Sequence, residues 1–447
     1  MKFIENIKNV WKIEELRNRI ILTLGLLLVY RFGAQVTLPG IDASKLGGFA
    51  SNFDGGGLGS LLNAFTGGAF ANASVFALGI MPYISASIVV QLMQIAVPYL
   101  QKLQKEGESG RKKINQITRW LTIGICLIQA PSYLLGLEAL GVPADAFILG
   151  KPLWFMVTST LILVTGTIFA MWLGEKITDK GIGNGISILI MVGIIATLPQ
   201  SFVQEFASRV FESNGGLIMV LIELVIWFVI ILACVMLVLA VRKIPVQYAR
   251  RTATGEYERN IFGARQFIPL KLNASGVMPI IFAQAIMFVP SAVASLSDSE
   301  WATSIQATYS DIFGLWYNVT FAILIIVFTY FYTAITVPTN KMADDLKRSG
   351  GFIPGIKPGT DTAELLDRIM SQITLPGSIF LALLAIFPAI VVKLMGLQQG
   401  WALFYGGTSL LIMVGVAIDT MQQINSYLLN RHYDGLMKSG KNRKAVA

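Results

Sequence analysis

The sequence predicts an all-α integral membrane protein with ten transmembrane helices, and three observations support this. Hydrophobic residues make up 54% of the 447 residues and charged residues only 14%, whereas soluble domains carry about 25% charged residues. Apolar runs long enough to cross about 30 Å of hydrocarbon recur along the chain. Lys and Arg outnumber Asp and Glu, 35 to 26, and gather in alternate connections between these runs, as is typical of a multi-pass membrane protein.

Ten apolar segments are the predicted spans. The first five are residues 20–36, 73–97, 117–137, 153–173 and 183–198, and the second five are residues 216–241, 276–293, 312–337, 374–394 and 403–428. Each is long enough, or nearly so, to cross the hydrocarbon as a helix. Because ten is even, both termini are expected on the same side of the membrane.

The distribution of Lys and Arg predicts which side that is. Counted together with Arg119 at the start of the third span, the N-terminus, the even-numbered connections and the C-terminal tail hold 30 of the 35 Lys and Arg residues. The odd-numbered connections hold only Lys45, Lys151, Arg209 and Lys393, and Arg31 lies near the end of the first span. Since an excess of Lys and Arg marks the cytoplasmic side, both termini are expected in the cytoplasm.

Two internal sequence matches indicate that the spans form two repeats of five. Residues 79–84 (Gly-Ile-Met-Pro-Tyr-Ile) match residues 276–281 (Gly-Val-Met-Pro-Ile-Ile) at the second span of each half, and residues 185–193 match residues 407–415 at the fifth. Because five is odd, the two halves, residues 1–210 and 211–447, are expected to be pseudo-symmetric and inverted. Inverted repeats place a central pathway at the interface between the halves.

Proline and polar residues mark the second and seventh spans. Pro82 and Pro279 occupy matching positions, and a proline inside a helix removes a hydrogen bond and favours a kink. Neighbouring polar side chains that could satisfy the freed carbonyls, or line a wet pathway, are Ser85, Ser87, Gln91, Thr122, Gln129, Asn273, Ser275 and Gln284. Ordinary hydrogen bonds between helices explain each of them equally well, and the pattern leaves both explanations open.

A short helix is expected between the first two spans, within residues 53–70. Glycines bracket residues 58–65, and a helix over these residues would be roughly 12 Å long, far too short to span. It is either a helix on the outer surface or a re-entrant helix that moves on glycine hinges.

Two connections on the expected cytoplasmic side, residues 242–272 and 338–372, are longer than topology requires. Loops of this length usually bind a partner or are disordered. The first is basic and could dock on RNA, anionic lipid or an acidic protein surface. The second contains Gly-Gly-Phe-Ile-Pro-Gly-Ile-Lys-Pro-Gly at residues 350–359, and this composition predicts an ordered tip.

The residue types needed for catalysis or for metal binding are nearly absent. His432 is the only histidine, and Cys126 and Cys234 lie in apolar runs, so no Cys/His metal site or Ser-His-Asp arrangement is available. No nucleotide-binding Gly-rich loop is present either. We therefore expect no enzymatic activity, no metal and no cofactor.

Two alternatives to a channel remain. The first is a secondary transporter with inverted repeats, which would need charged groups at the membrane midplane; Glu223 and Asp419 are the exceptions to spans that otherwise lack charge in their cores. The second is a scaffold or insertase subunit without a pore.

Several motifs resemble those of the SecY family, the central channel subunits of the bacterial Sec protein translocon. Residues 78–88 resemble the second-span signature and residues 181–187 the fifth-span signature, and residues 406–412 and the tip at 354–356 fit as well. The likeness covers nearly the whole chain. It implies a channel that passes unfolded secretory polypeptides across the bacterial inner membrane and releases apolar segments sideways into lipid, driven by a partner ATPase or a ribosome.

The resemblance also implies roles for single residues. An apolar pore ring is expected at Ile80, Ile84, Ile186, Ile190, Ile281 and Ile412. A plug is expected at Leu58, Ser60, Leu61, Leu62, Asn63 and Phe65, and a lateral gate at Pro82, Ser85, Gln91, Thr122, Asn273 and Pro279. Docking of the motor ATPase SecA and of the ribosome is expected at Arg242, Lys243, Arg250, Arg251 and Lys357. Four ring residues occupy equivalent positions of the repeat matches, namely Ile84 with Ile281 and Ile190 with Ile412.

One position departs from the family pattern, because Lys357 stands where the family usually has Arg. Lysine keeps the charge but loses the planar fork that binds a carboxylate through two hydrogen bonds, so motor coupling is weaker here unless a point charge is enough. The partners that the resemblance implies are small SecE-like and SecG-like membrane subunits, SecA, the ribosome, signal-sequence-bearing polypeptides and anionic lipids.

Overall fold

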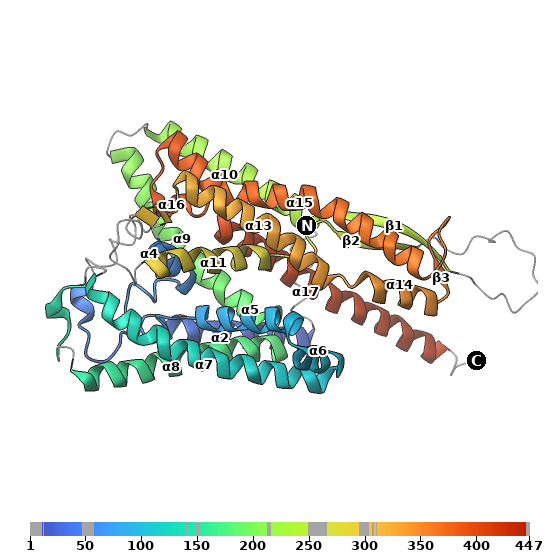
Figure 1. Ribbon diagram of the computed structural model, residues 1–447, viewed down its shortest axis with the longest axis horizontal. Coiled ribbons are helices and arrows are strands. Elements are labelled where there is room, and N and C mark those ends of the chain that lie inside the picture. The colour runs from blue at the N-terminus through green and yellow to red at the C-terminus, as the bar shows by residue number, and fades with distance from the viewer. Residues whose placement is uncertain are drawn as a thin grey trace, which may run out of the picture. The chain divides into compact units, whose positions relative to one another are not determined.

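The computed structural model describes residues 11, 13–46, 58–139, 142–148, 152–211, 216–248, 266–294, 304–305, 308–309 and 311–443. The chain forms two compact units, whose elements are labelled in Figure 1. Unit 1 comprises Met1–Gly216, Leu397–Phe404 and Ile412–Ala447, and unit 2 comprises Leu217–Gly396 and Tyr405–Leu411.

Unit 1 is built from helices. In chain order these are α2 (Glu14–Gly33), α4 (Leu58–Thr66), α5 (Met81–Ala96), α6 (Pro98–Lys105), α7 (Glu108–Ala139), α8 (Leu153–Lys180), α9 (Gly185–Phe211), α16 (Gln399–Ala402) and most of α17 (Gly407–Arg443), with short 3-10 turns at Ala43–Leu46 and Ala144–Ala146. Helix α7 packs against α5 and α8, α8 packs against α2 and α9, and α4 packs against α9.

Unit 2 combines long helices with a small sheet. Its elements are α10 (Gly216–Leu239), β1 (Val241–Tyr248), β2 (Gln266–Lys271), α11 (Met278–Ala294), α13 (Leu315–Thr336), α14 (Thr339–Arg348), β3 (Gly351–Phe352) and α15 (Thr360–Met395). Helix α13 packs against α11 and α15, and α14 packs against α15.

Each predicted span contains a helix in the described part of the chain: α2, α5, α7, α8, α9, α10, α11, α13, α15 and α17. Seven of the described helices are long and apolar enough to cross a membrane, and the bent pair α5–α6 raises this to eight. Helix α11 contributes only a short apolar stretch, Met278–Met287. Helix α2 is 20 residues long, but charged residues occupy both of its ends.

The surface of α10 is that of a lipid-facing helix. It has the highest mean hydropathy of the described spans, 3.1, and only 22% of its most apolar stretch is buried within the protein. Large apolar side chains that stay exposed along it include Leu217, Ile218, Leu221, Val225, Phe228, Val229 and Met236. Exposure of this much apolar surface is stable only against lipid or another protein.

The expected proline kinks are absent at Pro82 and Pro279, and this prediction was wrong. Both prolines lie in the first turn of their helices, α5 and α11. The backbone N–H groups of a first turn have no partner within the helix, so a proline there removes no hydrogen bond. The helical path is interrupted instead before Pro98, where Val97 is extended and the axes of α5 and α6 meet at 99°.

The backbone supports the internal repeat at both sequence matches. Helices α5 and α11 begin at the matched residues Met81 and Met278, each two residues after a glycine with positive φ, +54° at Gly79 and +64° at Gly276. Helices α9 and α17 begin at the matched residues Gly185 and Gly407. The segments that match in sequence therefore also match in the position at which their helices begin.

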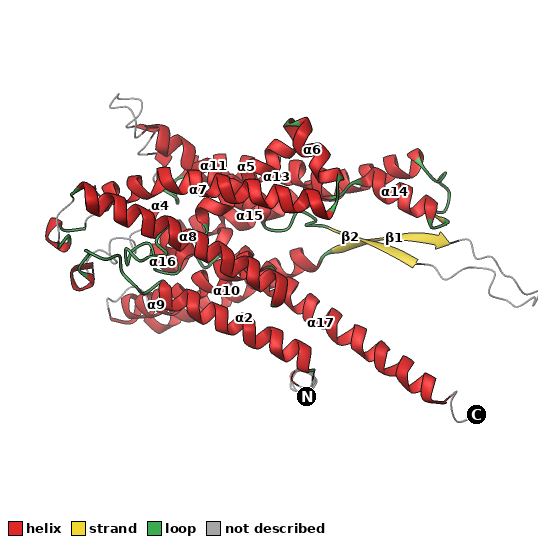
Figure 2. Ribbon diagram, turned by 90° about the horizontal axis from the view of Figure 1, so that it is seen from below, coloured by secondary structure: helices red, strands yellow, loops and turns green. Residues whose placement is uncertain are grey.

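A three-stranded antiparallel sheet of order β2-β1-β3 occupies the two long connections of unit 2, where only loops were expected. Figure 2 shows β1 and β2 as a yellow ribbon pair. Arg242 pairs with Leu270 and Lys243 with Pro269. Buried residues from the sheet, α14 and α15 form a shared core, which consists of Ile244, Val246, Leu270, Leu346, Ile353, Leu366, Met370 and Ile373.

Candidate functional site

The short helix α4 packs closely on α9 because α9 presents a glycine there. A Cβ added to Gly193 would lie 2.5 Å from the carbonyl oxygen of Phe65 and 3.3 Å from the amide nitrogen of Gly67. Phe65 and Leu61 of α4 are buried. The backbone of α4 therefore rests directly on the backbone of α9, which only glycine allows.

The contact face of α9 also carries two of the expected ring residues. Ile186, Ile190 and Gly193 follow the spacing i, i+4, i+7, which places them on one side of a helix. Ile190 is buried and Ile186 is partly buried. The structure thus brings the expected plug segment and two expected ring residues to the same face of one helix.

Four expected plug residues have defined places in this arrangement. Ser60 and Leu61 are buried and Leu62 is partly buried. Asn63 connects α4 to the chain that follows it, because its Oδ1 accepts a hydrogen bond from the Ala71 N–H at 3.0 Å and its carbonyl accepts one from the Gly68 N–H at 2.9 Å. Leu58 begins α4, and its side chain lies outside the described residues.

The end of α4 meets a cation from α2. Arg31 Nη1 donates a hydrogen bond to the carbonyl oxygen of Gly67 at 2.8 Å. Gly67 and Gly68 follow α4 directly, with φ of +66° and +90°, values that favour glycine. The turn therefore directs the carbonyl of Gly67, the residue that follows α4, toward the Arg31 guanidinium.

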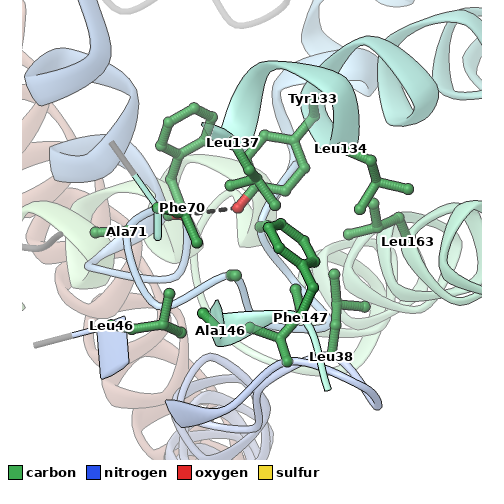
Figure 3. Close-up of a cluster of buried hydrophobic side chains, with 14 of the residues drawn as sticks. Leu38, Leu46, Phe70, Ala71, Tyr133, Leu134, Leu137, Ala146, Phe147 and Leu163 are labelled. Atoms are coloured by element: carbon green, nitrogen blue, oxygen red, sulfur yellow. Dashed lines mark hydrogen bonds between the residues drawn. The ribbon is translucent and has the colours of Figure 1, made fainter. Parts of the chain in front are cut away.

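The segment after this turn is fixed in the core of unit 1. The Tyr133 hydroxyl donates to the Phe70 carbonyl at 2.8 Å, and the rings of Phe70 and Tyr133 lie 4.9 Å apart. Figure 3 shows this hydrogen bond inside a cluster of buried side chains. The labelled members of the cluster are Leu38, Leu46, Phe70, Ala71, Tyr133, Leu134, Leu137, Ala146, Phe147 and Leu163.

A polar cavity of about 270 Å³ lies beside α4. Its polar lining comes from α2, α4 and its following turn, and α9; Gly400, Leu403 and Phe404 complete it. The polar side chains are Arg31, Gln35, Ser60, Asn63, Asn72, Thr197, Gln200 and Ser201. A cavity of this size and polarity is large enough for several water molecules, and α4 lies between this cavity and its close backbone contact with α9.

The remaining ring residues are buried or partly buried. Ile80 precedes α5, and the Ile84 N–H donates to the Ile80 carbonyl at 3.0 Å, so the two lie one turn apart. Ile412 is buried on α17 of unit 1, and Ile281 is partly buried on α11 of unit 2. The described contacts do not join these six isoleucines into one ring, and the ring stays a prediction.

A hydrogen bond and a close approach join α17 to the turn that precedes α9. Gln423 Oε1 accepts a hydrogen bond from the Gly183 N–H at 2.8 Å. A Cβ added to Gly183 would lie 3.1 Å from Thr420 Oγ1. One side of α17 carries Ile412, Thr420 and Gln423, at spacings of i, i+8 and i+11. The side of α17 that carries the expected ring residue Ile412 therefore also contacts the turn between α8 and α9.

The expected gate residues belong to different units. Pro82, Ser85, Gln91 and Thr122 lie in unit 1, on α5 and α7, and Asn273 and Pro279 lie in unit 2. Thr122 is fully buried and its hydroxyl donates to the Thr118 carbonyl at 2.8 Å; Gln91 Nε2 donates to Ser87 Oγ at 3.1 Å. Asn273 Oδ1 accepts from Ser275 Oγ at 3.3 Å. Their part in a gate stays a prediction.

The expected docking residues lie on or next to the sheet of unit 2. Arg242 and Lys243 are exposed on β1, and Lys357 is exposed between β3 and α15. Arg250 and Arg251 lie outside the described residues. The ordered tip is confirmed, because the Ile356 N–H donates to the Ile353 carbonyl at 3.1 Å and the Thr362 hydroxyl donates to the Lys357 carbonyl at 2.8 Å.

Sequence reasoning missed a buried ion pair at the end of α9. Arg209 Nε lies 2.8 Å from Glu205 Oε1, and the Gln398 N–H donates to Glu205 Oε2 at 2.9 Å. The i, i+4 spacing of the two charges was a signal for the pair. It holds the segment before α16 to α9, and Phe202 packs on Trp401 nearby.

No group of three or more His, Cys, Asp or Glu side chains that could hold a metal ion occurs among the residues that the structure describes. The arrangement consists of a short helix docked on a helix face, a polar cavity and a turn with two glycines of positive φ.

Known proteins resemble this chain over nearly its whole length. The sequence pattern of the SecY family matches residues 74–421. The chain is 38% identical to the protein translocase subunit SecY of Streptomyces griseus, with 96% of this chain and 98% of the relative covered. It is 40% identical to the subunit of the same name from Bacillus licheniformis, with 97% and 99% covered.

Solved structures share the fold at low sequence identity. A structure described as a protein-conducting channel is 15% identical, with a TM-score of 0.59 and 92% of each chain covered. A yeast Ssh1 complex bound to the yeast ribosome contains a chain that is 14% identical, with a TM-score of 0.57, and 91% of this chain and 89% of that chain are covered. Together with the sequence matches, this likeness establishes that the chain belongs to the SecY family of membrane-embedded protein translocase channel subunits, which are not enzymes.

Proposed function

We propose that the chain passes unfolded secretory polypeptides through a path lined by the six ring isoleucines, and that α4 is the plug that closes this path at rest. The observation that carries the proposal is the shared face of α9, where Ile190 lies about one turn and Ile186 about two turns from Gly193, the glycine that receives α4. An apolar constriction blocks ions by losing its water while offering them no binding site. A plug held on the same face would seal it further.

The proposed location is a bacterial inner membrane with both termini in the cytoplasm. The two sequence relatives described above come from bacteria, and 30 of the 35 Lys and Arg residues fall on the expected side of the termini. The proposed halves are residues 1–210 and 211–447, and a lateral gate between α5 and α7 on one side and α11 and α13 on the other would release apolar segments into lipid.

The exposed cations of the sheet region are the proposed docking surface for the motor ATPase SecA and the ribosome. Arg242, Lys243 and Lys357 present their charges on a folded support, and the Ssh1 structure was determined on a ribosome. SecE-like and SecG-like subunits would complete the complex, and anionic lipids would bind the same basic connections.

Disulfide crosslinking tests the proposed path. Single cysteines would replace Ile84, Ile190, Ile281 and Ile412, and a secretory precursor carrying one cysteine would be stalled in membranes with SecA and ATP. Crosslinks at all four positions are expected, and a cysteine on the lipid-exposed side of α10, at Phe228, serves as the control that should not react. A precursor that crosslinks to the cytoplasmic connections but to none of the four would overturn the path.

The same variants distinguish the alternatives. Ile84→Gly, Ile190→Gly and Ile412→Gly should raise ion leak or allow transport of precursors with defective signal sequences. Unchanged conductance and unchanged signal selectivity would favour a subunit without a pore. Tight binding of a small solute or coupling ion to the purified protein would favour a secondary transporter.

A further inference from the structure

Arg31 is placed where it can control the plug, although nothing in its sequence context assigns it that task. Its guanidinium donates to the Gly67 carbonyl at 2.8 Å. Gly67 is buried, and a Cβ there would meet both Arg31 Nη1 and, at 2.8 Å, the Cα of Gly193. Arg31, the end of α4 and the glycine of α9 therefore meet at one point.

Within the described residues, the turn that follows α4 is a place where the helix can change direction. On one side of it, Phe70 is buried and its carbonyl is held by the Tyr133 hydroxyl. On the other side, α4 is a helix of nine residues. Between them lie Gly67 and Gly68, both with positive φ, and glycines of this kind allow large changes of backbone direction. Displacing α4 would require rotation here and would leave the anchored segment in place.

The charge of Arg31 suits the closed position for two reasons. The last carbonyls of a helix carry partial negative charge, which a nearby cation stabilises. A hydrogen bond from a guanidinium is also stronger than one between neutral groups. Both effects require the Gly67 carbonyl to point at Arg31, and rotation of the turn would remove them together.

Breaking the contact between Arg31 and Gly67 does not leave the guanidinium in apolar surroundings, because Arg31 also lines the polar cavity. Arg31 lines the polar cavity of about 270 Å³ together with Gln35, Asn63 and Gln200. A guanidinium that loses the carbonyl can therefore be solvated there rather than left unsatisfied in apolar surroundings. The contact can hold α4 without making the closed position permanent.

We propose that Arg31 is the positioning residue that holds the plug closed, through its hydrogen bond to the carbonyl of Gly67. The proposal rests on the assignment of α4 as the plug. The proposal predicts that removing the Arg31 guanidinium shifts the channel toward the unplugged state without reducing transport of a normal precursor.

The test compares Arg31→Gln, Arg31→Lys and a matched control, Lys45→Gln, in the complete translocon in membranes. Lys45 also donates to a carbonyl, that of Asp145 at 2.9 Å, in the same unit; its replacement removes the same charge and the same kind of contact away from α4. The readouts are resting ion conductance, transport of a precursor with a defective signal sequence, and the rate of disulfide formation between cysteines placed at Ser60 and Thr197, which line the same cavity.

For Arg31→Gln we expect resting conductance to rise about tenfold or more, the change in a closed-to-open ratio that loss of one charge-assisted hydrogen bond produces. Disulfide formation should slow, the defective precursor should be transported, and a normal precursor should be transported at least as fast. Arg31→Lys should restore most of the closure, and Lys45→Gln should match the parent protein.

Two results would overturn the role of Arg31. One is conductance and disulfide formation that are unchanged in Arg31→Gln while Ile190→Gly leaks, since the path would then be correct and the contact irrelevant. The other is an equal loss of normal transport in Arg31→Gln and Arg31→Lys, which would indicate a merely structural residue. If Ile190→Gly also fails to leak, the proposed path itself is wrong.

Discussion

The missing side chain of Gly193 lets the carbonyl oxygen of Phe65 approach α9 so closely that a Cβ at Gly193 would lie 2.5 Å from it. Both contacting groups are backbone, so neither can move aside as a flexible side chain would. The position of α4 therefore depends on one residue of another helix.

Gly193→Ala is expected to push α4 off α9. Overpacking of this kind costs about 1–3 kcal/mol, which would raise the undocked population from about fivefold to more than about a hundredfold. Resting ion conductance in planar bilayers should increase accordingly. Gly124→Ala on α7 is the control, because a Cβ there meets nothing within 4 Å. Equal conductance of the two variants would show that α4 does not seal the path.

Tyr133→Phe is expected to loosen the anchor of the segment after α4. The variant keeps the ring that packs on Phe70 and loses the hydrogen bond to the Phe70 carbonyl, at a cost of about 0.5–1.5 kcal/mol. Hydrogen exchange should become faster at residues 69–74. The exposed Tyr99 provides the control variant Tyr99→Phe. Faster exchange in both variants, or in neither, would contradict the anchor.

The helices were the part of the structure that the sequence predicted best. Each of the ten apolar segments contains a helix, although the second span was expected to begin at residue 73 and its helix begins at Met81. Hydrophobicity and local motifs act over short distances along the chain, so they can be read directly. The short helix α4 was found for the same reason, from the glycines on either side.

The errors came from features that the local pattern describes ambiguously. A proline near the start of an apolar run fits either a kink or a first turn, and at Pro82 and Pro279 the first turn was correct. Strand β1 lies in a connection that was expected to be a long basic loop, and Pro245 gives the segment little strand character, because proline is rare inside sheets. Pro245 is exposed on the strand while its neighbours Ile244 and Val246 are buried.

The contacts of the site could not be predicted because they join distant residues. Arg31 was counted only as a charge near the end of the first span, and its carbonyl partner lies 36 residues further along the chain. Gly193 belonged to a repeat match that gave no reason for a glycine. Only packing shows that it receives the backbone of α4.

The buried pair of Glu205 and Arg209 gives a stability prediction. Their side chains are only 3% and 7% exposed, and removal of one partner from a buried pair costs on the order of 3–5 kcal/mol. Glu205→Ala should therefore lower the thermal unfolding midpoint of the purified protein markedly. The double variant Glu205→Met, Arg209→Met should recover much of the loss, because it leaves no unpaired charge. A double variant as unstable as the single one would contradict this account.

Lys357 gives a prediction about motor coupling. Lys357→Glu should slow SecA-driven translocation and weaken SecA binding, because it reverses an exposed charge on the ordered tip. Lys357→Arg should be as active as the parent protein or more so, since a planar fork replaces a point charge. Translocation rates with purified SecA measure both. Lys180→Glu, an exposed charge at the end of α8, is the control, and a similar defect there would indicate a general charge effect rather than docking.

With α4 as the proposed plug, the anchor at Phe70 and Tyr133 has a consequence for how the channel would close again after a polypeptide has passed. Because α4 is tethered to the core through the short turn at Gly67 and Gly68, its return to α9 is an intramolecular event with an effective concentration in the millimolar range or above. Resealing should therefore proceed at a rate that is independent of how many channels the membrane contains, and it requires no separate stopper to diffuse to the pore.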